Sequence, residues 1–103
     1  MGIVLENGYE MMTTFWSDFS IADAFGTDAI RDTYSKCVKE FRNDYKYLTE
    51  LVMVLNWKMF QWHRKDENGE EWKIYLELYE ELDSWCMDNL KGIELQYFIK
   101  TTD

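Results

Sequence analysis

The chain has 103 residues, no proline and a formal charge of −9 from 20 acidic and 11 basic residues. A chain of this length can form one domain that folds without a bound metal or a disulfide bond. The two cysteines, Cys37 and Cys86, are expected to be small buried apolar residues rather than a redox pair. No apolar run approaches the ~18 to 20 residues that a membrane span requires, and no secretory leader is recognisable, so we expect a cytoplasmic protein that does not contact membranes.

The N-terminal residues are predicted to lie apart from the rest. Residues 1–12 hold a turn signal, Asn7-Gly8, and a short apolar run over residues 3–5. Three apolar residues cannot form an independent unit, so we expect a peripheral arm followed by a single helical domain over residues 13–103.

Two helices are predicted on either side of Gly26. The first covers residues 14–25 and ends where Gly26 can adopt a left-handed cap. The second covers residues 28–43, with Thr27 and Asp28 supplying a cap and a negative first turn.

A continuous apolar stripe from Ile30 to Trp62 makes the next boundary ambiguous. One helix from residue 28 to residue 64 would be about 55 Å long, against a breadth of roughly 30 Å for a domain of this size. Asn43 and Asp44 favour caps and turns over helix interiors. We therefore favour a break or kink near Asn43 and a third helix over residues 45–64; the alternative is one long helix that needs a second chain beside it.

Two further helices complete the predicted fold. Asn68 and Glu71 resemble a capping box at the start of a helix over residues 69–90, and Lys91-Gly92 closes it. A short helix follows over residues 93–100. The sequence thus predicts an all-α fold, a small bundle of four to five helices.

The charges are sorted along the chain. Residues 1–30 carry five acids and no base, residues 31–65 carry eight bases against four acids, and residues 66–90 carry nine acids against Lys73. Either acidic and basic helices pack against each other, or an acidic face is offered to a basic partner.

The helix over residues 69–90 has a predicted apolar stripe of Trp72, Leu76, Tyr79, Leu82, Cys86 and Leu90. Opposite that stripe lies a row of carboxylates, the acidic ridge, formed by Glu70, Glu77, Glu81 and Asp88.

The acidic ridge has two interpretations. It is a solvated face, or it is a partner-binding surface on which Leu78 and Trp85, apolar residues outside the predicted stripe, act as anchors. Helical spacing places these carboxylates one or two turns apart, so the ridge can stand in for a run of nucleic-acid phosphates.

The helix over residues 45–64 has a second apolar side, the aromatic patch, formed by Met53, Trp57 and Phe60. A helix that is apolar on two sides lies at the centre of a domain or at the centre of an assembly. The patch is therefore covered by other helices, or it forms a homodimer interface or a partner-binding groove built around Trp57.

Several other functions have little support in the sequence. The basic cluster from Arg31 to Lys46 is better suited to complementing the acidic helices, since a charge of −9 opposes direct nucleic-acid binding. His63 is the single histidine, so no two-histidine metal site can form within one chain. No phosphate loop or nucleophile elbow occurs, and we expect neither an enzyme nor a bound cofactor.

One further signal comes from short stretches spread over much of the chain: residues 15–23, Phe25-Gly26, residues 32–34, residues 43–58, Leu90-Lys91-Gly92, Glu94-Leu95, Tyr97-Phe98 and Thr102-Asp103. In these stretches the chain resembles small hypothetical proteins encoded on conjugative elements and prophages of gram-positive gut bacteria. The resemblance implies a context in which small acidic proteins block host defence nucleases, including as anti-CRISPR and anti-restriction inhibitors.

The leading hypothesis is therefore a non-enzymatic acidic protein from a mobile element. Its acidic ridge, with Leu78 and Trp85, would occupy a basic nucleic-acid-binding surface on a protein partner in the manner of a DNA mimic. The alternative is a structural or regulatory homo-oligomer that pairs through Met53, Trp57 and Phe60.

Overall fold

The computed structural model describes residues 8–102, which form five helices and no strand. The helices are α1 (Gly8–Phe25), α2 (Thr27–Phe41), α3 (Tyr45–Lys65), α4 (Glu71–Asn89) and α5 (Ile93–Thr102). The predicted all-α bundle of four to five helices is confirmed. Among the described residues, none of the helices combines the length and apolarity that crossing a membrane would need.

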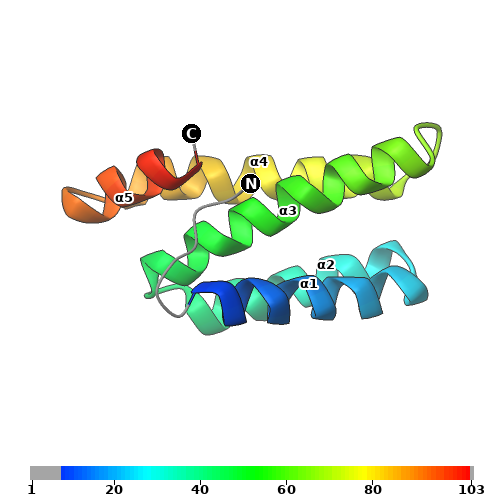
Figure 1. The fold of residues 1–103 in the computed structure, drawn as a ribbon, viewed down its shortest axis with the longest axis horizontal. Helices are drawn as coiled ribbons and strands as arrows, with labels where there is room; N and C mark the ends of the chain where they lie inside the picture. Colours follow the sequence, from blue (N-terminus) through cyan, green and yellow to red (C-terminus); the bar gives the residue numbers. More distant parts are fainter. Residues whose placement is uncertain (1–7, 103) are drawn as a thin grey trace.

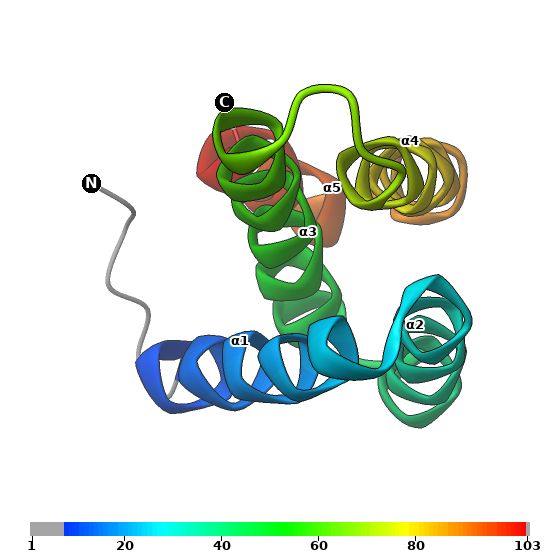
Figure 2. The ribbon, with the colours of Figure 1, turned by 90° about the vertical axis from the view of Figure 1, so that its right-hand side faces the viewer.

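Helix α3 lies in the middle of the molecule. Figure 1 shows α1 and α2 side by side on one side of it and α4 and α5 on the other, and Figure 2 shows the same arrangement end-on. The molecule measures 39 × 26 × 25 Å. Because helices cover α3 on two sides, burial extends around its N-terminal half, from Leu48 to Leu55. This central position explains why the sequence of α3 is apolar on two sides.

The core joins apolar side chains from all five helices. Its large members that are less than 2% exposed include Phe15 and Phe19 of α1, Ile30 of α2, Tyr75 of α4 and Phe98 of α5. From α3 it takes Leu48, Leu51, Val52, Val54 and Leu55.

The long apolar stripe is interrupted where Asn and Asp occur, as predicted. Helix α2 ends at Phe41, Arg42 and Asn43 form a turn, and Asp44 caps α3, with its Oδ1 accepting a hydrogen bond from the Tyr47 amide at 3.4 Å. The turn lets α3 fold back across α1 and α2. One chain can therefore bury the whole stripe.

Two helix starts differ from the prediction. Helix α1 begins at Gly8 instead of residue 14, because Met11 and Met12 pack against the core and extend the apolar side of the helix. The expected arm over residues 1–12 is thus wrong for residues 8–12, and residues 1–7 lie outside the described part of the chain. Helix α4 begins at Glu71 without a side-chain cap. The predicted capping box fails because Asn68 lies within a turn, where the Gly69 amide donates to the Asp66 carbonyl at 3.0 Å.

Candidate functional site

Helix α4 is rotated relative to the apolar stripe predicted from its sequence. Its buried side chains are Tyr75, Leu78, Leu82 and Cys86, and Leu78 is only 4% exposed. Trp85 is half-buried and packs against the core. Leu78 is therefore covered by the protein's own helices, whereas Trp85 is covered only in part. Leu78 cannot anchor a partner, which corrects that assignment.

The four carboxylates of the acidic ridge are all exposed, but they are not equivalent. Glu77 Oε2 accepts a hydrogen bond from Arg31 Nη2 of α2 at 2.8 Å. This contact lowers the pKa of Glu77 and raises that of Arg31. Both groups are solvated, so the pair contributes little to stability. It does place a cation in the middle of the ridge.

Glu81 also faces α2. Burial, together with the Glu81 carboxylate, raises the pKa of the Tyr34 hydroxyl, and Tyr34 itself is 7% exposed. Glu70 and Asp88, at the two ends of the ridge, form no ion pair within residues 8–102. The middle of the acidic ridge therefore packs against α2, which neutralises Glu77 and contacts Glu81. The two ends of the ridge remain open to solvent.

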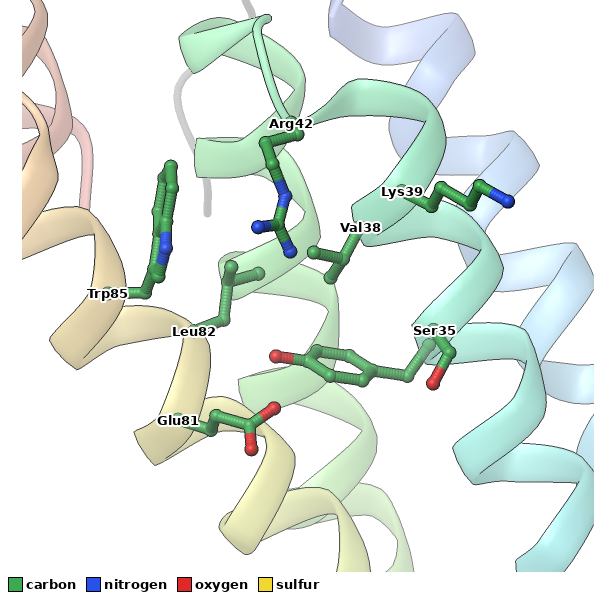
Figure 3. Close-up of a pocket in the computed structure, with 8 residues that line it drawn as sticks. Ser35, Val38, Lys39, Arg42, Glu81, Leu82 and Trp85 are labelled. Atoms are coloured by element: carbon green, nitrogen blue, oxygen red, sulfur yellow. The ribbon is translucent and has the colours of Figure 1, made fainter.

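A cavity of about 440 Å³ lies between α2 and α4 (Figure 3). Its apolar wall is formed by Val38, Leu82 and Trp85. The guanidinium carbon of Arg42 lies 5.6 Å from the centre of the Trp85 ring, within the range of a cation–π contact. Tyr34, Ser35, Lys39 and Glu81 complete the lining.

The structure contains a buried polar cluster that the sequence analysis missed. Lys58 is 1% exposed, and its Nζ donates to Ser20 Oγ and Asp23 Oδ2, both at 2.8 Å, and to Gln61 Oε1 at 3.2 Å. The same Nζ lies 4.4 Å from the centre of the Trp16 ring.

Tyr75 joins this cluster from α4. Its hydroxyl donates to Asp23 Oδ1 at 2.5 Å. The cluster thus fixes α1 against both α3 and α4. The available signal was the position of Lys58, between Leu55 and Trp62 on the apolar stripe of α3, where a solvated lysine does not fit.

The aromatic patch is split between covered and exposed residues. Met53 is 9% exposed, whereas Trp57 is 37% and Phe60 49% exposed. Two of the three predicted interface residues therefore reach the surface, and Met53 does not.

The remaining reactive side chains form no catalytic arrangement within residues 8–102. Cys37 and Cys86 are separate buried thiols, and burial raises their pKa values to about 11 and about 12. The described residues contain no group of three or more His, Cys, Asp or Glu side chains that could hold a metal ion. His63 lies on the surface, edge-on to the Trp72 ring.

Comparison of the chain with protein-family models, with curated proteins and with solved structures gives no match. No function is therefore transferred from a relative.

Proposed function

We propose that this protein is a non-enzymatic binding protein that presents the acidic surface of α4 to a basic, nucleic-acid-binding surface of a protein partner. Supporting this, residues 66–90 contain nine acidic residues, and of these nine only Glu67 and Glu77 form ion pairs within residues 8–102. The Glu67 pair is weak, with 3.9 Å to His63 Nε2. Most of this negative charge is therefore available to an external partner.

The proposed contact set differs from the four-residue acidic ridge. Glu77 is paired and Glu81 is turned toward α2, so the partner would meet Glu70, Glu80 and Asp88, which are exposed. Glu70 and Asp88 are separated by about 27 Å along the helix axis, the length of about eight base-pair steps. Because Glu77 is paired with Arg31, the row of free carboxylates is interrupted near its centre, which fits a partner that has separate basic sites rather than one continuous phosphate groove.

The resemblance to mobile-element proteins selects the partner class to test first. Defence nucleases combine a basic nucleic-acid channel with a role against mobile elements. A protein that occupies such a channel needs no catalytic residues, because it acts by excluding DNA or RNA through charge and shape.

Charge reversal at the two ends of the ridge tests the proposal. In a panel of purified CRISPR effectors and restriction endonucleases, the wild-type protein is expected to displace fluorescent DNA from at least one member. The double variant Glu70→Lys/Asp88→Lys is expected to weaken this displacement by about 100-fold or more, because it places cations against a basic surface. Fluorescence anisotropy measures the displacement, and added salt should weaken the wild-type effect.

A matched control separates a specific surface from net charge. Asp18→Lys/Glu40→Lys makes the same change in charge at exposed positions of α1 and α2 and is expected to retain displacement within about threefold. If both variants lost DNA displacement to the same extent, net charge rather than a specific surface would explain the effect. Failure to displace DNA from any member of the panel would contradict the proposal.

The exposure of Trp57 and Phe60 favours a second candidate, a homo-oligomer. Aromatic side chains at the surface of α3 are typical anchors of interfaces. If this candidate holds, analytical ultracentrifugation is expected to show a dimer at tens of micromolar, and Trp57→Ala/Phe60→Ala is expected to shift it to monomer. A wild-type protein that stays monomeric across this range would remove the candidate.

A further inference from the structure

The cavity between α2 and α4 brings two opposite charges to one apolar wall. Arg42 and Glu81 both line it, and neither forms an ion pair within residues 8–102. Arg42 follows the last turn of α2, and Glu81 lies on α4 one turn before Trp85. A cation and a carboxylate that border the same cavity without pairing leave two charged groups for a ligand.

The two charges face the same cavity from different helices. In Figure 3 the Arg42 guanidinium points into the cavity beside the Trp85 ring, and the Glu81 carboxylate points into it from α4. Val38 and Leu82 lie on either side of the guanidinium. The Lys39 side chain extends away from the cavity, so Arg42 supplies the cation that faces it.

Tyr34 also lines the cavity. It is buried, and the Glu81 carboxylate contributes after burial to the raised pKa of its hydroxyl, which places the two groups near each other. On the other side, the Arg42–Trp85 contact orients the guanidinium plane. The Arg42 guanidinium is thus partly oriented before a ligand arrives, which lowers the entropy cost of binding.

We propose that this cavity binds a free α-amino acid with an apolar side chain. The ligand's carboxylate would accept two hydrogen bonds from the Arg42 guanidinium, its ammonium group would donate to Glu81, and its side chain would pack on Trp85, Leu82 and Val38. A volume of about 440 Å³ lies within the usual range for small-molecule sites. A simple anion would be repelled by Glu81 and a simple amine by Arg42, whereas a zwitterion satisfies both.

The proposal does not depend on the proposed partner surface. It uses Arg42 and Glu81, whereas the contact set on α4 uses Glu70, Glu80 and Asp88. Loss of one activity therefore leaves the other testable.

A titration followed by NMR tests the proposal. Addition of L-phenylalanine to the ¹⁵N-labelled full chain is expected to shift the indole N–H signal of Trp85 and the amide signals of residues 34–42 and 81–85. A ligand of this size is expected to bind with a Kd on the order of 1 mM. 3-Phenylpropionate, which lacks the ammonium group, and 2-phenylethylamine, which lacks the carboxylate, are each expected to bind about tenfold more weakly. Absence of shifts up to about 20 mM phenylalanine, or equal affinity for the three compounds, would overturn the proposal.

Two substitutions that remove one charge each test the Arg42 contact and the Glu81 contact separately. Arg42→Gln is expected to abolish the preference for phenylalanine over 2-phenylethylamine, and Glu81→Gln is expected to abolish its preference over 3-phenylpropionate. Lys36→Gln, an exposed change on α2 outside the cavity, is the matched control and should keep both preferences. Selectivity that survives both cavity substitutions would exclude this site even if phenylalanine binds the protein.

Discussion

Replacing Lys58 with methionine is expected to lower the free energy of unfolding by about 3–5 kcal/mol, the usual cost of removing one partner from a buried ion pair. The Lys58 and Asp23 side chains are 2% and 12% exposed, and their charged atoms lie 2.8 Å apart. Methionine preserves most of the side-chain volume, so the loss would report the uncompensated Asp23 carboxylate rather than a cavity. Urea unfolding followed by far-UV circular dichroism measures it.

Two further variants identify the cause of that loss. Lys36→Met breaks the exposed Asp32–Lys36 pair, whose side chains are 63% and 77% exposed, and is expected to change stability by less than about 0.5 kcal/mol. Asp23→Asn combined with Lys58→Met removes both charges while keeping an acceptor for Tyr75, and is expected to recover roughly half of the loss. If the double variant is as unstable as Lys58→Met alone, the uncompensated charge is not the cause.

The helix boundaries that were predicted correctly depend on local chemistry. Gly26 has φ 107° and Gly92 has φ 58°, conformations that side-chain-bearing residues rarely adopt, so both helix ends could be located from glycine alone. Asp44 caps α3 through a bond to a residue three positions later. Each of these signals lies within one or two turns of the residue that it explains.

The rotation of α4 could not be predicted in the same way. Its sequence places apolar residues around much of the helix, including Leu76 and Leu78, which lie about 160° apart around the helix axis, so periodicity alone gives more than one candidate face. The face is selected when α4 packs against α2 and α3, which leaves Leu78 buried and Leu76 half-exposed. The error in assigning Leu78 as a partner contact followed directly from the wrong rotation.

The same limit applies to contacts between distant residues. The Arg31–Glu77 pair joins residues 46 positions apart, and the Lys58–Asp23 bond joins residues 35 positions apart. Charge sorting suggested that basic and acidic helices can complement each other, but which carboxylates are neutralised depends on the relative positions of the helices. For that reason the ends of the acidic ridge, and not its centre, remain as a candidate surface.

Glu50 is expected to make the stability of the protein depend on pH near neutrality. It lies on α3, is 1% exposed, and neither of its carboxyl oxygens has a hydrogen-bond partner within residues 8–102. Burial, with a smaller contribution from the nearby Asp44 carboxylate, raises its pKa from 4.5 to about 7. On α5, burial and the charge of Glu50 raise the pKa of Tyr97. The Lys46 ammonium lies 6.0 Å from the centre of the Tyr97 ring.

The sign follows from the direction of that shift. Because the pKa of Glu50 is higher in the folded protein than in the unfolded chain, the folded state holds a proton that the unfolded chain releases above about pH 4.5. This stabilisation is present in full at lower pH and is lost as the pH rises through about 7. Between pH 5 and pH 8, Glu50 is therefore expected to remove on the order of 2 kcal/mol from the free energy of unfolding.

Glu50→Gln removes the titration with little change in shape. Relative to wild type, this variant is expected to become more stable as the pH rises, gaining on the order of 2 kcal/mol between pH 5 and pH 8 in urea unfolding. Glu40→Gln, an exposed change on α2, should show no such trend. A constant difference between wild type and Glu50→Gln across this range would mean that Glu50 is not protonated in the fold.

Hydrogen exchange can show where ionisation of Glu50 acts. Because Tyr97 places α5 against this carboxyl group, charging it is expected to weaken the contact between α3 and α5 before the rest of the bundle opens. At pH 8 the amides of α5 should therefore exchange faster in wild type than in Glu50→Gln, while those of α1 and α2 exchange at similar rates in both. Equal acceleration in every helix would instead indicate global unfolding.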